Sequence, residues 1–193
     1  MVIIANELLE LAIATASCTS CGLADSRSQV VFGIGSPKAQ VMIVGEAPGF
    51  NEDQAGEPFV GAAGHLLDRL LEEIEIDRSA VYLTNVIKCR APNDRVPQAE
   101  EVDACKGYLL EQMKLIEPKV VVALGGLVSQ LLLKSILPIS QLRGQSYDWW
   151  RGIVVIPTHS LAEGLAGGPD VVDAMQADFV ALRAVVDRLI SSI

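Results

Sequence analysis

Four short hydrophobic segments recur along the chain and predict the strands of one sheet. They are residues 41–44, 80–87, 120–124 and 153–156, and each is bounded by glycine, proline or polar residues. Apolar runs of this length, rich in β-branched side chains, are typical of strands buried on both faces of a parallel sheet. The pattern therefore predicts a mainly parallel four-stranded central sheet.

The segments between these strands carry apolar residues at helical spacing. After position 62, five of them share one helical face: Leu66, Leu67, Leu70, Leu71 and Ile74. Pro97, followed by acidic residues, is typical of the first turn of another helix. Further helices are expected over residues 1–16, after Gly125 and from about Asp170. Strands that alternate with helices imply right-handed crossovers and an α/β fold.

Length and composition point to a single domain over residues 1–193. The chain is 50% hydrophobic, and its 193 residues suffice for one α/β domain but not for two. No apolar run reaches the length of a membrane span. Residues 1–16 contain acidic residues and no basic one, which does not fit a signal peptide. We therefore expect a monomeric, cytoplasmic protein that does not contact membranes.

The four cysteines form the first candidate site. Cys18 and Cys21 are three positions apart, and Cys89 and Cys105 follow much later in a loop and a helix. In a chain without an export signal, cysteines indicate metal or redox chemistry rather than disulfides. Two close and two distant thiolates can enclose one tetrahedral centre, either zinc or an iron–sulfur cluster. The alternative is four unrelated buried cysteines, which behave as small hydrophobic residues.

The loops after the predicted strands form the second candidate site. Ligands of open α/β sheets bind outside the carboxyl ends of the strands. There the chain places Glu46, Phe59, Asn85 and His159, with Glu52 and Asp53 just beyond the first loop. An aromatic ring, a side-chain amide and an imidazole suit a flat, polar heterocycle. Singly, Phe59 could be a core residue and His159 a structural one, so the prediction rests on their convergence.

Several motifs carry a resemblance to a known family. They are Cys18-x-x-Cys21, Gly45-Glu46-Ala47-Pro48-Gly49, Pro58-Phe59-Val60-Gly61, Thr84-Asn85-Val86-Ile87-Lys88-Cys89-Arg90, Cys105 and Pro157-Thr158-His159. With them the chain resembles the uracil-DNA glycosylases of the iron–sulfur type, usually called family four. The resemblance covers nearly the whole chain from Cys18 onward. It implies a three-layer α/β/α fold and a DNA repair enzyme that leaves an abasic site.

The resemblance also implies residue roles in a pocket for a flipped uracil. Phe59 would stack on the base, Asn85 would contact its polar edge, and His159 would donate to O2. Glu46 would position water and stabilise positive charge on the sugar. Glu52 would crowd C5 and exclude thymine. The neighbouring Gly45, Ala47 and Asp53 are expected to complete the substrate-binding loops.

The resemblance implies one cofactor and one macromolecular partner. A structural [4Fe–4S] cluster would be bound by Cys18, Cys21, Cys89 and Cys105. The partner would be uracil-containing DNA, single- or double-stranded. A net charge of −9 counts against a large DNA-binding surface that is independent of sequence. The candidates for local phosphate contacts are therefore Lys88, Arg90, Arg95 and Arg143.

The chain departs from the family pattern after His159. A proline is expected there, but the chain has Ser160, and no arginine follows before Pro169. This change predicts weakened duplex binding and a preference for single strands. It also motivates an alternative function, an iron–sulfur protein that binds uracil-containing or single-stranded DNA without excision. A further alternative is an α/β protein that acts on a free nucleotide.

Overall fold

One six-stranded sheet forms the centre of the protein, whose computed structural model describes residues 2–190. The strands are β1 (Ile34–Gly35), β2 (Val41–Gly45), β3 (Val81–Asn85), β4 (Val120–Leu124), β5 (Tyr147–Asp148) and β6 (Val154–Thr158). Their order is β1-β3-β2-β4-β6-β5, and the four central strands are parallel. The prediction of a mainly parallel sheet is confirmed. The two antiparallel edge strands have two residues each, too short to leave a hydrophobic pattern.

Helices connect the strands and cover both faces of the sheet. The α-helices are α1 (Val2–Ala16), α2 (Phe50–Ala55), α3 (Ala62–Glu73), α4 (Ala99–Ile116), α5 (Gly126–Leu133), α6 (Ile139–Leu142), α7 (Leu161–Ala166) and α8 (Pro169–Ile190). Short 3₁₀ helices are η1 (Gly22–Asp25), η2 (Arg78–Ala80), η3 (Pro92–Asp94) and η4 (Trp150–Gly152). The five predicted helices, α1, α3, α4, α5 and α8, are confirmed, whereas the short α2, α6 and α7 were not predicted.

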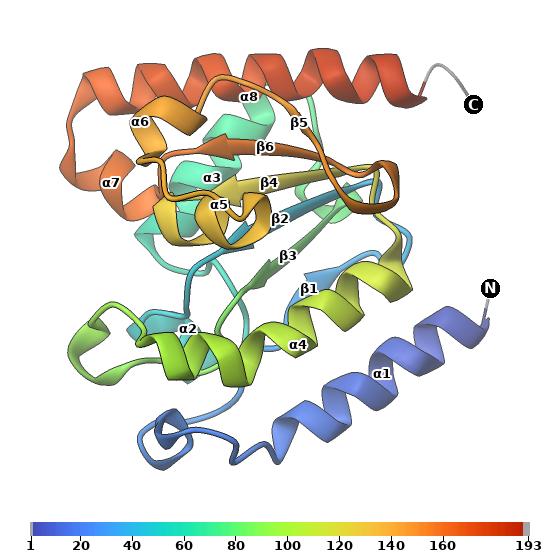
Figure 1. Cartoon of the computed structure of the whole chain (residues 1–193), viewed down its shortest axis with the longest axis vertical. Helices are drawn as coiled ribbons and strands as arrows, with labels where there is room; N and C mark the ends of the chain where they lie inside the picture. The colour runs from blue at the N-terminus through green and yellow to red at the C-terminus, as the bar shows by residue number, and fades with distance from the viewer. Residues whose placement is uncertain (1, 191–193) are drawn as a thin grey trace.

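Side chains of the central strands point alternately to the two faces of the sheet, and each face contributes to its own hydrophobic core. Met42 and Val44 of β2 face the core that includes buried residues of α1, α4 and α5. Ile43, between them, faces the opposite core with α3, α7 and α8. Successive strand side chains point to opposite faces, so a strand that is apolar throughout needs helices on both sides. The result is the predicted three-layer α/β/α arrangement (Figure 1).

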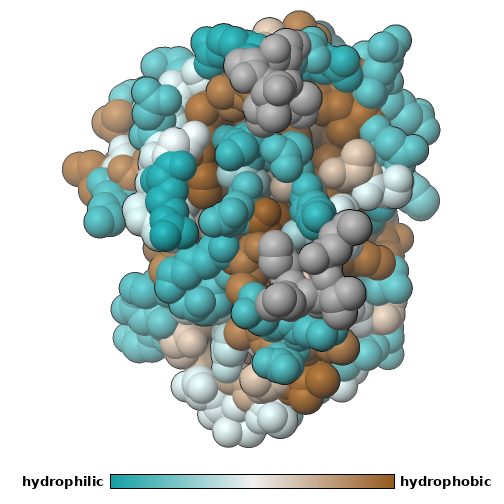
Figure 2. Space-filling view, turned by 90° about the vertical axis from the view of Figure 1, so that its right-hand side faces the viewer, coloured by the Kyte–Doolittle hydropathy of each residue, from teal (hydrophilic) through white to brown (hydrophobic). Residues whose placement is uncertain are grey.

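The parallel register brings the carboxyl ends of the central strands to one edge. Gly45 of β2 lies opposite Asn85 of β3, and Leu124 of β4 lies opposite Thr158 of β6. The loops that follow these strands therefore meet at that edge, on the left in Figure 1. Figure 2 shows the other end of the molecule, where small hydrophobic groups are scattered among hydrophilic residues. Among the described helices, none combines the length and apolar character needed to cross a membrane.

Candidate active site at the carboxyl edge of the sheet

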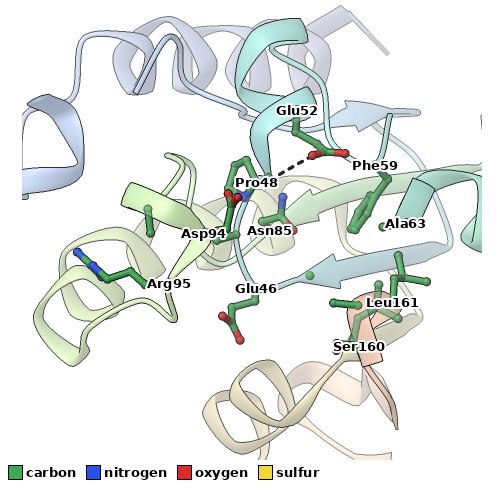
Figure 3. Close-up of a pocket in the computed structure, with 16 residues that line it drawn as sticks. Glu46, Pro48, Glu52, Phe59, Ala63, Asn85, Asp94, Arg95, Ser160 and Leu161 are labelled. Carbon is green, nitrogen blue, oxygen red and sulfur yellow. Dashed lines mark hydrogen bonds between the residues drawn. The ribbon is translucent and has the colours of Figure 1, made fainter. Parts of the chain in front are cut away.

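A cavity of about 290 Å³ lies at this edge, and we call it the edge cavity. Six of the predicted site residues line it: Gly45, Glu46, Ala47, Glu52, Phe59 and Asn85. The first strand loop, the loop before α3 and the end of β3 therefore converge as the sequence predicts (Figure 3). Asp53 and His159 are not among the residues that line the edge cavity.

Asn85 and Phe59 form one side of the edge cavity, where the absence of a side chain at Gly45 lets them approach β2. Asn85 is buried, with 2% of its surface exposed. A Cβ atom at Gly45 would lie 2.3 Å from Asn85 Oδ1 and 3.0 Å from Phe59 Cζ. No larger residue fits at position 45 without moving the amide and the ring. Figure 3 shows these two side chains next to each other.

Glu46 supplies a carboxylate that is free to act on a ligand. Its side chain points away from Asn85 in the close-up (Figure 3). Burial raises the pKa of Glu46 above its ordinary value, and the negative charge of Glu163 raises this pKa further. In residues 2–190 no group donates a hydrogen bond to this carboxylate. A half-buried carboxylate without a partner can accept a proton from a ligand or from water.

Glu52 has a different role, because both of its oxygens accept hydrogen bonds from backbone amides. Oε1 accepts from Val60 N and Gly61 N at 3.0 Å each, and Oε2 accepts from Gly49 N at 3.2 Å. These bonds join the loop after β2 to the loop before α3. Any contact between Glu52 and a base would therefore be made by a fixed carboxylate, which suits steric exclusion better than proton transfer.

Phe59 is held in a backbone conformation that is unusual for a residue with a side chain. Its φ angle is 56°, in the left-handed region. Arg78 Nη2 donates to Phe59 O at 2.9 Å, and Arg78 Nη1 lies 2.5 Å from Asp68 Oδ1. A Cβ atom at Gly64 would lie 1.9 Å from Phe59 O, so position 64 requires glycine. Strain of this kind is typical of functional sites, where surrounding contacts hold the residue in place.

Asp53 lies away from the edge cavity, although its neighbour Glu52 lines it. Asp53 is buried, and its two carboxylate oxygens accept from Ser28 N at 2.9 and 3.1 Å. It thus ties α2 to the segment that follows the first two cysteines. Adjacent helical residues point in different directions, which explains why only one of the two predicted carboxylates reaches the cavity.

The expected phosphate-binding residues are engaged in hydrogen bonds with other groups of the protein. The prediction that Lys88 contacts phosphates is wrong, because only 1% of its surface is exposed. Arg143 donates to both carboxylate oxygens of Asp178, at 3.0 and 2.9 Å. Arg90 and Arg95 are bound in the same two-pronged way by Asp94 and Glu101, respectively. Of the four, only Arg95 lines the edge cavity.

The loop after β6 presents Ser160 to the edge cavity, together with Leu161 and Ala162. Ser160 Oγ accepts from Glu163 N at 3.1 Å, and Glu163 Oε2 accepts from Ser160 N at 2.7 Å. This capping box starts α7 and leaves the hydroxyl proton of Ser160 available to a ligand. His159 Nδ1 is buried without a hydrogen-bond partner and lies 3.8 Å from Glu163 Oε2. A catalytic role of His159 stays a prediction.

All four cysteines line a second cavity, which we call the cysteine cavity. Cys18 and Cys21 follow α1, Cys89 follows β3, and Cys105 lies on α4. No disulfide joins them. Arg27 Nη1 donates to Cys89 Sγ at 3.3 Å, and the Lys88 amide donates to Cys105 Sγ at 3.3 Å. Hydrogen bonds to sulfur stabilise thiolates, so the cysteine cavity is suited to bind a metal centre through sulfur.

Comparison with known proteins matches the sequence to a family. The model of the Uracil DNA glycosylase superfamily matches residues 32–166. This range includes every residue of the edge cavity named above. The chain belongs to the uracil-DNA glycosylase superfamily.

Curated members of the superfamily resemble the chain over most of its length. The chain is 42% identical over 175 residues to a type-4 uracil-DNA glycosylase of Sulfurisphaera tokodaii, covering 86% of this chain and 79% of the relative. A type-4 enzyme of Archaeoglobus fulgidus is 41% identical over 170 residues, covering 84% and 85% of the two chains. One of Thermotoga maritima is 46% identical over 142 residues, covering 73% and 74%. The resemblance to family four is thus confirmed.

Two residues of this uracil-DNA glycosylase site were not predicted from the sequence. Arg78 fixes the carbonyl group of Phe59, but nothing in the local sequence distinguishes it from a surface arginine. Ser160 lines the edge cavity, and the local sequence contains a pattern that could have predicted this position. The sequence Ser160-Leu161-Ala162-Glu163 has the spacing of a capping box, which places a helix start at Ser160 and turns that residue toward the strand ends.

Proposed function

We propose that this chain removes uracil from DNA by hydrolysing the N-glycosidic bond and leaves an abasic site. The observation that carries the proposal is the edge cavity, where Phe59, Asn85 and Glu46 converge in a member of the uracil-DNA glycosylase superfamily. Its volume of about 290 Å³ lies at the small end of the range for ligand pockets, roughly 300–1,000 Å³. A single flipped base suits this size better than a larger ligand.

The base would be bound through its ring face and its polar edge. The Phe59 ring offers a stacking surface, and the buried Asn85 amide offers a donor and an acceptor to the uracil edge. The fixed Glu52 carboxylate supports exclusion of a methyl group at C5. A duplex substrate must first release the base from its stack, at a cost of a few kcal/mol that single-stranded DNA reduces.

The bond to break is the one between C1′ of the sugar and N1 of uracil. Its electron pair leaves with the base as a uracil anion, and the sugar becomes oxocarbenium-like. The Glu46 carboxylate stabilises this positive charge and accepts a proton from the water whose oxygen attacks C1′. Preorganised charges and donors at both ends of the bond supply most of such a rate enhancement.

A hydrogen-bond donor is also needed near uracil O2, where negative charge develops. The resemblance to family four assigns this donor to His159. The lining of the edge cavity supports Ser160 instead, since its hydroxyl proton is not used by the capping box. Each assignment is a proposal, and the two are distinguished by replacing each residue with alanine.

We propose that the cysteine cavity holds the [4Fe–4S] cluster. Four cysteines on one cavity and two N–H donors to sulfur support this assignment. The cluster would join three chain segments and stiffen the wall behind Asn85.

A second function is favoured by one observation at the loop after β6. Since His159 does not line the edge cavity, the chain could lack an effective donor at O2. It would then bind uracil-containing or single-stranded DNA without releasing the base. This function and the glycosylase share the cavity but differ in the product.

The deciding experiment uses a labelled oligonucleotide with one uracil, single-stranded and paired with guanine or adenine. After incubation with the protein, alkali cleaves the strand at any abasic site. Cleavage at the uracil, fastest in the single strand, is the expected result, and Glu46→Ala at the same metal content is the control. Retention of uncleaved uracil DNA in a gel would replace the proposal with the binding function. No cleavage and no retention would contradict both.

A further inference from the structure

Lys88 is fully buried between the edge cavity and the cysteine cavity, and neither site uses it in the roles described above. Only 1% of its surface is exposed, and it lines the cysteine cavity. Its backbone is held on both sides, since its amide donates to Cys105 Sγ at 3.3 Å and its carbonyl accepts from Val31 N at 2.8 Å. Burying a lysine is costly unless its charge and its donors are satisfied.

The Lys88 side chain turns back along the chain toward the base-contacting end of β3. Nζ donates to Asn85 O at 2.7 Å, to Thr84 Oγ1 at 2.6 Å and to Gln112 Oε1 at 2.6 Å. The bond to Asn85 clamps the backbone of the residue whose amide lines the edge cavity. Lys88 thus contacts the proposed uracil-reading residue and a cysteine on opposite sides.

The partners of Lys88 Nζ belong to a wider buried network. Thr84 Oγ1 also donates to Phe32 O at 2.8 Å and lies 3.3 Å from Gln112 Oε1. The amide nitrogen of Gln112 donates to Phe32 O and to Tyr82 Oη. Lys88 is therefore joined to Asn85 within a set of connected hydrogen bonds rather than by one isolated contact.

Residues 86–88 connect the two cavities, and each of their backbone amides donates a hydrogen bond. After Asn85, the amide of Val86 donates to Gly45 O at 2.8 Å, and the amide of Ile87 donates to Glu46 O at 2.9 Å. The chain then reaches Lys88 and Cys89. A displacement at the cysteine cavity is therefore passed to the two sides of the edge cavity through adjacent, hydrogen-bonded groups.

We propose that Lys88 is a positioning residue that couples the cysteine centre to the base-reading Asn85. The inference rests on the proposed function. The bound centre would fix Cys105 and with it the Lys88 backbone, while Lys88 Nζ fixes Asn85. Loss of the centre would free Cys105, so the clamp on Asn85 would loosen although no cysteine lines the edge cavity. Coupling of this kind requires a contiguous element that both sites influence, and residues 85–89 supply it.

The test compares Lys88→Met with Tyr82→Phe in protein that holds its metal centre. Methionine keeps the apolar length of the side chain but has no donor. Tyr82→Phe removes a hydrogen bond from the same buried network without touching Lys88 or Asn85, which makes it the matched control. Two quantities are measured: amide hydrogen exchange of residues 84–88 by mass spectrometry, and uracil release per metal-loaded chain.

Lys88→Met is expected to increase exchange at residues 84–88 but not at β6, and to slow uracil release by about 10–100-fold. Tyr82→Phe is expected to change neither quantity by a comparable amount. Removing the centre from the wild-type protein by oxidation and chelation should produce the same local increase in exchange. A uniform increase over all strands would indicate general destabilisation and contradict the proposal, as would wild-type exchange and rate in Lys88→Met.

A milder variant keeps the test decisive if Lys88→Met does not fold. Thr84→Val removes one hydrogen-bond partner of Lys88 Nζ and leaves the contact of Nζ with Asn85 O in place. It should show a smaller increase in exchange at residues 84–88, and an unchanged pattern here and in the metal-free wild type would overturn the inference. If the wild type releases no uracil, the proposed function fails, while the exchange measurements still decide the coupling.

Discussion

The cysteine cavity and the edge cavity differ in how completely their polar groups are paired. Around the cysteines, Arg27 and the Lys88 amide donate to sulfur, and Lys88 Nζ has three hydrogen-bond partners. At the edge cavity, the Glu46 carboxylate accepts no hydrogen bond within the described structure. His159 Nδ1, in the residue before the cavity-lining Ser160, is also without a partner there. Buried polar groups are normally paired, so the unpaired ones indicate where a ligand or water is to be bound. The cysteine cavity is therefore expected to be rigid, and the edge cavity is expected to bind the reacting ligand.

The largest effect on metal content and stability is expected from replacing a cysteine of the cysteine cavity. Cys105→Ala removes a proposed ligand and the acceptor of the Lys88 amide. We expect nearly complete loss of bound iron and of the brown colour, together with reduced thermal stability. Iron analysis and visible absorption check the result. Glu46→Ala, at the other cavity, should keep both the iron and the colour. Full iron content in Cys105→Ala would contradict the proposed ligand set.

The next largest effect is expected on the rate of excision when Glu46 of the edge cavity is replaced, with no change at the cysteine cavity. Glu46→Gln keeps the shape of the side chain and removes its charge. Excision should slow by about 10²–10³-fold, the usual cost of one preorganised electrostatic group in a transition state. Single-turnover kinetics on a single-stranded uracil oligonucleotide measures the rate, and thermal unfolding should be unchanged or slightly higher, because burial disfavours the charged form. An unchanged rate would remove Glu46 from the mechanism.

The same difference explains which features could be predicted from sequence. The strands and long helices follow from hydrophobic spacing, because burial on two faces leaves a strong pattern. All four cysteines share one cavity as their residue type suggested. Six of the eight residues predicted around the base share the edge cavity, but Asp53 and His159 do not line it. Their placement depends on where α2 and α7 begin, since Asp53 lies in α2 and His159 lies two residues before α7. A shift of one residue there turns a side chain to another side.

An intermediate effect is expected at the loop after β6, where Ser160 and His159 compete for one role. Ser160→Ala removes a donor from the wall of the edge cavity and should slow excision by about 10²-fold. His159→Ala should have a clearly smaller effect, because His159 does not line that wall. The two variants are compared under single-turnover conditions at equal metal content. The opposite ranking would restore the sequence-based assignment of His159.

The smallest effect is a shift in pH dependence that connects Glu46 to its acidic neighbour. Glu46 must be ionised to accept a proton, so excision should increase as pH rises through its pKa, which burial and Glu163 both raise. Glu163→Gln removes that negative charge while keeping an acceptor for Ser160, so the acidic limb should move to lower pH. Glu111→Gln removes the same charge from the exposed surface of α4 and should not move it. If the acidic limb of the pH–rate profile does not move in Glu163→Gln, the effect of Glu163 on the pKa of Glu46 is contradicted.

The most direct test of the account is base selection by Asn85. Wild type and Asn85→Asp are compared for release of free base from single-stranded oligonucleotides that carry either uracil or cytosine. The wild type should release uracil only. Asn85→Asp should lose uracil release and gain cytosine release, since a carboxylate accepts from the exocyclic amine. Uracil release that survives the replacement, with no gain on cytosine, would contradict the edge cavity as the site where the base is read.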